Sequence, residues 1–183
     1  MKGISIAFLV LIACVIGCNN SSISTQSAPS TKNDYPKEES FKVENWSYSN
    51  ETDEMDQSKR FFAYCASTNK VDFKFPYNGG SALTVLVRNM NKKNEIILSI
   101  SKGQFISSYS GDENVRFKFD EEKPITISYS SAKDGSSNFV FPENSKMIIG
   151  KLKKAKKLMI EAPFFDEGTS VFYFNIDGLK WSF

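Results

Sequence analysis

After Trp46, apolar residues alternate with polar ones along much of the chain, and this pattern constrains the fold more than any other feature. A period of two puts successive side chains on opposite faces of a β-strand. Alternation occurs at 71–75, 83–87, 95–100, 115–119 and 125–129, and segment 171–176 is apolar on both faces. Turn-forming residues lie between the segments, at 78–80, 111–112, 134–135, 167–168 and 177–178. The pattern predicts a mainly β fold, an antiparallel β-sandwich of the jelly-roll type.

Two segments of this region have more specific predictions. Pro142 followed by Asn144 or Ser145 predicts the start of one short helix, which would place Ile148, Leu152 and Ala155 on one face. Residues 157–162 then resume a strand. In segment 167–181, Phe172, Phe174 and Ile176 form a wholly apolar face and the opposite face is largely apolar as well. A strand that is apolar on nearly both sides is expected in the middle of a sheet.

The N-terminal residues predict export and lipidation. Residues 1–17 combine Lys2 with an apolar run that is shorter than the roughly 20 residues a transmembrane helix needs. Val15-Ile16-Gly17-Cys18 resembles the bacterial lipobox, which implies a lipid on Cys18 and cleavage just before it. Asn19 stands where an inner-membrane retention signal would have aspartate. We therefore expect a lipid-anchored protein of the bacterial cell envelope, at the outer membrane and facing the periplasm.

Two alternatives to lipidation remain open. Residues 1–17 would also serve as an ordinary signal peptide with an incidental Cys18. A eukaryotic secreted protein is the other alternative, because Asn45 and Asn50 begin triplets of the glycosylation type.

Residues 19–40 are polar and rich in serine, and they contain too few large apolar side chains to form a core. The predicted organisation is therefore a lipoprotein signal peptide at 1–17, a lipidated cysteine and flexible tether at 18–44, and a β-sandwich domain at 45–183. A coil of the tether's length spans roughly 28 Å on average, which allows the domain to stand clear of the bilayer surface.

The composition argues against catalysis. The chain has no histidine, which removes the commonest general base and zinc ligand. Cys65 lies in an apolar segment and is expected in the core, and the carboxylates cluster at predicted turns, where surface solvation explains them. The formal net charge of +2 is too small to indicate a nucleic-acid partner. We expect a protein that is not an enzyme and that needs no cofactor or metal.

The strongest charge feature is the basic stretch from Lys146 to Lys157. Its lysines form a candidate surface for anionic lipid headgroups, lipopolysaccharide phosphates or an acidic protein partner. The candidate residues are Lys146, Lys151, Lys153, Lys154, Lys156 and Lys157. The alternative is a solvated helix face whose charge is balanced by the acidic turns.

Several short motifs occur in an order that resembles the type VI secretion-associated periplasmic proteins of the TagO/VasI kind. They are Trp46, "LTVLVRN" at 83–89, "IILSISKGQF" at 96–105, "VRFKFD" at 115–120, "ITISYSSAKDGSSNFVF" at 125–141, the basic helix, and "APFFDEGTSVFYFNIDGLKW" at 162–181. The resemblance implies a small envelope accessory with a β-sandwich-like domain and no established enzyme activity. Family members often have a cysteine where Asn89 stands here, so no disulfide is carried over.

Two functions follow as expectations. The first is a non-catalytic binding or assembly accessory of the envelope, for a type VI secretion system if the resemblance holds, with a protein partner in the envelope. The alternative is an inhibitor-type lipoprotein, an immunity or phage superinfection-exclusion factor that blocks an incoming protein. A resident partner would distinguish the accessory from the inhibitor, whose partner would be a toxin or a phage protein.

Overall fold

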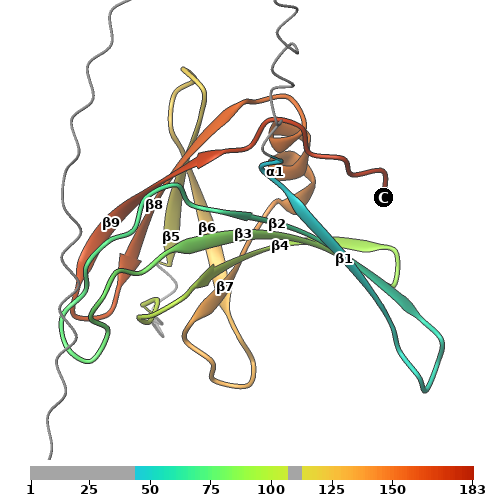
Figure 1. Ribbon diagram of the computed structural model, residues 1–183, viewed down its shortest axis with the longest axis horizontal. Helices are drawn as coiled ribbons and strands as arrows, with labels where there is room; N and C mark the ends of the chain where they lie inside the picture. The colour runs from blue at the N-terminus through green and yellow to red at the C-terminus, as the bar shows by residue number, and fades with distance from the viewer. Residues whose placement is uncertain (1–43, 107–112) are drawn as a thin grey trace, which may run out of the picture. The chain divides into compact units, whose positions relative to one another are not determined.

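The computed structural model describes residues 44–106 and 113–183 (Figure 1). These residues form a mainly β structure with one short helix, as the alternation predicts. In chain order the elements are β1 (Ser47–Thr52), β2 (Lys59–Ala66), β3 (Leu83–Met90), β4 (Lys93–Ile100), β5 (Asn114–Phe119), β6 (Ile125–Ser131), β7 (Phe139–Pro142), α1 (Ser145–Leu152), β8 (Lys157–Phe164) and β9 (Gly168–Asn175). The predicted signal peptide, Cys18 and the predicted tether up to residue 43 lie outside the described residues.

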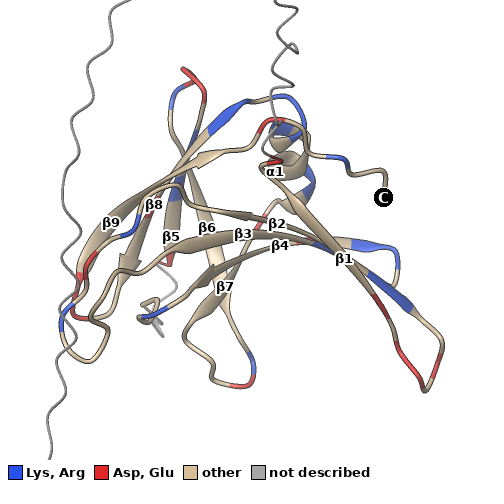
Figure 2. Cartoon of the chain, in the orientation of Figure 1, with Lys and Arg blue, Asp and Glu red and all other residues tan. Residues whose placement is uncertain are grey.

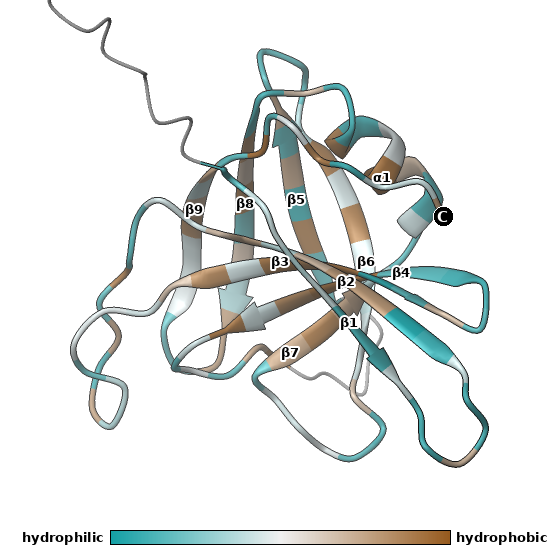
Figure 3. Cartoon of the chain, turned by 45° about the vertical axis from the view of Figure 1, so that its right-hand side comes forward, coloured by the Kyte–Doolittle hydropathy of each residue, from teal (hydrophilic) through white to brown (hydrophobic). Residues whose placement is uncertain are grey.

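The strands form one antiparallel sheet in the order β1-β2-β3-β4-β7-β6-β5-β8-β9. The sheet bends at β6, whose first residues, Ile125–Ser128, pair with β5 while Tyr129–Ser131 pair with β7. As a result, β2 and β3 cross in front of β5, β8 and β9 (Figure 3). The jelly-roll sandwich stays a prediction, because the pairing gives a single continuous sheet.

The core lies between the two arms of this bent sheet. The inward positions of the alternating strands are fully or almost fully buried, for example Val85, Leu98, Phe117, Ile160 and Phe172. Helix α1 packs against the core through Ile148 and Leu152, both 0% exposed, and the buried Ala155 follows just after it, so the predicted helix face is confirmed. Within the described ranges, no helix has the length and apolarity to cross a bilayer.

The prediction of a strand at 71–75 is wrong. Only an isolated bridge joins Val71 to Ser81, and the chain then makes a tight turn in which Tyr77 N donates to Lys74 O at 2.8 Å. The apolar side chains of this segment separate instead of sharing a face, since Phe73 is buried and Phe75 is 86% exposed. The alternation here marks a loop with one buried ring.

The prediction that segment 171–176 is a central strand is also wrong, because β9 is the last strand of the sheet. Its inward face is buried as expected, but Tyr173 on the outward face is 47% exposed. The free edge of β9 is covered by a loop instead of a strand. Thr68 N donates to Tyr173 O at 2.7 Å, and the Asn69 side chain bonds Val171 O and Tyr173 N.

Candidate functional site

A groove of about 960 Å³ lies along the outer face of the sheet, between β3–β4 and the segment from β6 to α1. It is a concave surface with both aromatic and charged side chains. The residues that line it include Arg88, Met90, Lys93, Asn94, Glu95, Ser130, Ala132, Phe139, Phe141, Asn144, Ser145 and Lys146.

The groove exists because β7 is shorter than the strand beside it. β4 has eight residues and β7 only four, and the two strands pair only at Leu98 and Ser99 of β4. β7 ends at Pro142, after which Asn144 adopts a left-handed conformation with φ 55° and turns the chain into α1. In place of a strand partner, the Ser145 hydroxyl accepts the Ile96 N–H at 3.1 Å. The first part of β4 therefore pairs with β3 on one side. On its other side it has no strand partner and faces the groove and the start of α1.

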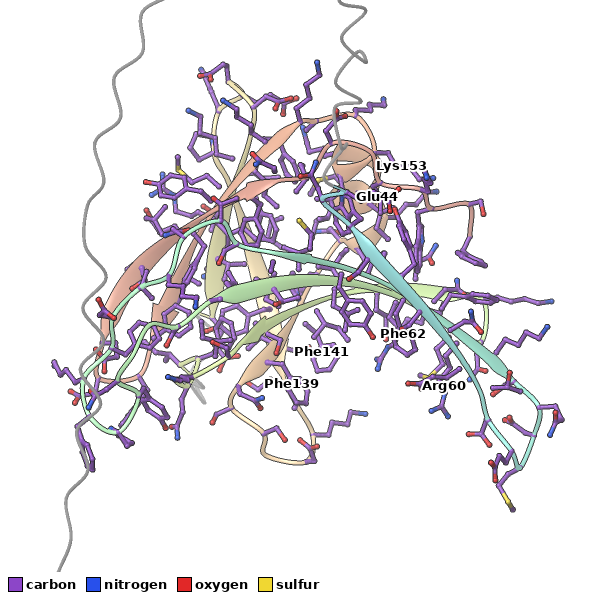
Figure 4. All side chains as sticks on the ribbon, viewed as in Figure 1. Glu44, Arg60, Phe62, Phe139, Phe141 and Lys153 are labelled. Atoms are coloured by element: carbon purple, nitrogen blue, oxygen red, sulfur yellow. The ribbon has the colours of Figure 1, made fainter. Side chains whose placement is uncertain are left out.

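The floor beside the groove is apolar, although it lies on the outer face of the sheet. Strand register puts the outward side chains Phe62 and Tyr64 of β2, Leu86 of β3, Ile97 of β4, and Phe139 and Phe141 of β7 on this face. The Phe62 and Tyr64 rings stack at 6.0 Å, and Phe139 meets Phe141 edge to face at 5.8 Å. Figure 4 shows Phe62, Phe139 and Phe141 on the same side of the sheet. We call these six residues the aromatic floor.

An ion pair borders the aromatic floor. Arg88 and Glu95 stand directly opposite each other on β3 and β4, with 2.5 Å between Nη2 and Oε2. Lys93 Nζ lies 3.2 Å from the other Glu95 oxygen, and the Arg88 guanidinium lies 6.0 Å from the centre of the Phe141 ring. The arrangement fixes a planar cation against an aromatic ring at the mouth of the groove.

The protonation of Glu95 follows from these contacts. Burial by itself would raise its pKa, but hydrogen bonds from Arg88 and Lys93, together with their charges, outweigh burial and hold the pKa below its ordinary value. A carboxylate that stays ionised and has both oxygens bound suits recognition better than proton transfer. The groove is therefore chemically suited to binding.

The six candidate lysines do not form one surface. Lys146, in the first turn of α1, lines the groove. Lys151 pairs with Glu122 and lies 5.6 Å from the centre of the Phe119 ring. The charge of this lysine is therefore balanced by an acidic turn. The other four lysines are exposed: Lys153, Lys154 and Lys156 lie in the segment that links α1 to β8, and Lys157 is the first residue of β8 (Figure 2). We call these four the basic loop.

The predicted core position of Cys65 is confirmed. Its side chain is 2% exposed, and burial raises the pKa of the thiol to about 12. The Sγ atom lies 3.3 Å from Asn175 O. A thiol with this pKa is protonated at neutral pH and is a poor nucleophile. In the described part of the chain, no group of three or more acidic, cysteine or histidine residues is placed to hold a metal ion.

Sequence reasoning did not single out Arg88, Glu95, Phe139 or Phe141 as site residues. The signal that would have found them is an apolar or paired side chain at an outward position. Phe139 and Phe141 flank the inward Val140, so they occupy positions that alternation assigns to solvent. On β3, Leu86 is likewise an apolar side chain at an outward position, and Arg88 is a paired one. Cys18, the predicted lipidation site, lies outside the described residues.

No family model, curated protein or solved structure matches this chain. The function must be inferred from the surfaces of the chain itself. The groove with its aromatic floor and the exposed basic loop are the two surfaces that have chemistry to interpret.

Proposed function

We propose that the chain is a lipid-anchored protein of the bacterial envelope that binds a protein partner through the groove and its aromatic floor. The observation that carries this proposal is the set of half-buried aromatic rings on an outer sheet face, next to the Arg88–Glu95 pair. Aromatic residues and arginine are enriched at the centres of protein interfaces, where they supply most of the binding free energy. The lipobox at Cys18 supports the anchor.

The shape of the groove favours an extended segment of the partner. On the β7 side of β4, strand pairing within the described chain is limited to Leu98 and Ser99, and the Ile96 N–H is bonded to the Ser145 hydroxyl. An extended segment lying in the groove would place its side chains against Phe139 and Phe141. Lys93, Lys146 and Glu143 at the rim favour a segment with charges of both signs outside its apolar positions.

The proposal places the protein at the outer membrane, facing the periplasm, as a non-catalytic accessory. The resemblance to type VI secretion-associated proteins suggests a secretion system as the setting, and a sandwich-like domain is part of the same proposal. An inhibitor of an incoming protein would use the same groove. The identity of the partner distinguishes the two, since an accessory binds a resident protein of the producing cell.

A photocrosslinking experiment in intact cells tests the proposal. A photoreactive amino acid at position 141, in the groove, is compared with the same amino acid at position 173, which is exposed on the outer face of β9. We expect position 141 to give one discrete crosslinked protein, which mass spectrometry identifies, and position 173 to give none.

An Arg88→Gln change should weaken the crosslink, because it removes the cation beside Phe141. The same crosslinked proteins at both positions, or none at position 141, would contradict binding through the groove. Mass spectrometry of the mature N-terminus tests the anchor independently. An acylated Cys18 is expected, and a Cys18→Ala chain recovered in the same membrane fraction and amount would overturn the anchor.

A further inference from the structure

The first described residues of the chain lie beside the end of β9. The Trp46 indole N–H donates to Ile176 O at 2.8 Å, and the Asn45 side chain donates to Asp177 O at 3.2 Å. Ile176 N in turn donates to Lys156 O at 2.8 Å, within the basic loop. The point at which residues 1–43 join the domain is therefore at the same end of the domain as the basic loop. Figure 4 shows Glu44 and Lys153 together at this end.

The positive charge of the basic loop is not cancelled by direct contacts. Among the described residues, no carboxylate forms a salt bridge with its four ammonium groups. The adjacent acidic turn has other partners. Asp120 accepts the backbone N–H groups of Lys156 and Lys157, and Glu122 pairs with Lys151. Glu121 lies 3.8 Å from Lys118. The lysine side chains are thus free to contact something outside the domain.

We propose that the basic loop rests on the anionic phospholipid headgroups of the membrane in which the lipid on Cys18 is inserted. This inference rests on the proposed function, because it needs the anchor to bring the domain to the bilayer. Between Cys18 and Glu44 lie 25 residues. The flexible tether that the sequence predicts here would span roughly 28 Å on average, which is short enough for the basic loop to reach the headgroups around the anchor.

The chemistry of the loop fits a headgroup layer better than an acidic protein. Four lysines in five consecutive positions present flexible, strongly hydrated point charges on exposed side chains. Each lysine close to an anionic bilayer strengthens binding about fivefold at physiological salt. A lipid chain and a polybasic segment together anchor a protein more stably than either signal alone. The positive charge of the basic loop and its position near the N-terminal connection therefore both favour an anionic membrane surface as its partner.

The contact would also orient the domain. In Figure 4, Phe62, Phe139 and Phe141 lie on the side of the sheet away from Lys153 and Glu44. With the basic loop on the bilayer, the aromatic floor is directed away from the lipid and stays accessible to a protein partner.

Lysine acetylation of the full chain, read by mass spectrometry, tests the inference without altering the protein. The purified lipoprotein is inserted into neutral phosphatidylcholine vesicles or into vesicles that also contain phosphatidylglycerol. In anionic vesicles, we expect acetylation of Lys153, Lys154, Lys156 and Lys157 to fall at least fivefold relative to neutral vesicles. High salt should reverse the protection, because ions screen the attraction.

Four other exposed lysines of the same molecule, Lys59, Lys92, Lys93 and Lys133, provide the matched internal control. Their acetylation should be the same in both kinds of vesicle. Equal acetylation of the basic loop in both kinds of vesicle would overturn the inference, as would equal protection of the control lysines. If the N-terminus proves unlipidated, the anchor fails separately, and the same measurement with vesicles added to the free chain still decides whether the loop binds anionic lipid.

Discussion

The bent sheet has two outer surfaces with different chemistry. On β5, β8 and β9 the outward positions are mostly polar, and the Arg116–Glu161 pair, 2.8 Å between Nη1 and Oε1, is half exposed. On β2, β3, β4 and β7 the outward positions form the aromatic floor, and the Arg88–Glu95 pair is more buried. The inward faces of both arms are equally apolar. Folding therefore explains the inward residues, whereas the aromatic floor is an excess that folding alone does not require.

The largest change in stability is expected for a buried residue on the inward face of the sheet. Phe174→Ala removes a ring that is 2% exposed in the core and should lower the free energy of unfolding by about 3 to 5 kcal/mol. Tyr173→Ala, one residue earlier and outward, should change it by less than about 1 kcal/mol. Denaturant titration of both variants measures the difference. Equal losses would show that β9 is buried on both faces.

The second effect concerns the aromatic floor itself. Phe141→Ala removes a half-buried ring that packs on Phe139 and Arg88, and we expect a loss of about 1 to 2 kcal/mol together with loss of the crosslink from a photoreactive amino acid at position 139, which also lines the groove. Met159→Ala on the other outer surface is the control and should leave any crosslink intact. If Phe141→Ala abolished folding, the aromatic floor would be a second core and not a binding surface.

Third, the two ion pairs should differ. Glu95→Gln should cost about 1 kcal/mol at pH 7, because it leaves the partly buried Arg88 without its carboxylate, whereas Glu161→Gln should cost less than about 0.5 kcal/mol. The pKa of Glu95 is lower in the folded chain, so its contribution is complete above the usual glutamate pKa near 4.3 and is lost as pH falls through the folded value. Titrations at pH 7 and pH 3 should show a smaller Glu95→Gln penalty at pH 3 than at pH 7.

The smallest effect is expected at the basic loop. Lys153→Ala should change stability by less than about 0.5 kcal/mol, since the side chain is exposed and has no salt bridge in the described part of the chain. Thermal denaturation of the variant and the parent provides the measurement. A large loss would give Lys153 a structural role and weaken its assignment to a membrane contact.

The sequence predicts the strands whose inward residues are apolar and whose outward residues are polar. Strands β5 and β6 follow this pattern, and the helix face of Ile148 and Leu152 is equally clear. β1 could not be predicted, because all six of its residues are exposed and β2 is its one strand partner in the described part of the chain. Segment 71–75 has the pattern of a strand, but Val71 bridges only to Ser81 and Lys74 N donates to the Glu167 side chain, which periodicity does not detect.

The edge position of β9 could not be predicted for a different reason. Apolar content indicates whether a residue is covered, but it does not identify what covers it, and here Thr68 and Asn69 replace a neighbouring strand. The groove was missed because it depends on a length difference between β4 and β7, which are neighbours in space and separated in sequence. By contrast, the basic stretch could be recognised from the lysine content of residues 146–157. The structure was needed to show that Lys146 lines the groove and that Lys151 pairs with Glu122.

The hydrogen bond from Trp46 to Ile176 has a consequence for the order of events during synthesis. It joins residues 130 positions apart, so Trp46 acquires its partner only when the last strand has been made. Contacts of this separation form late and slowly, because a long loop must close before they contribute. A growing chain that lacks β9 leaves Trp46 and the inner face of β8 uncovered. We therefore expect the domain to complete its core only after β9 has been made.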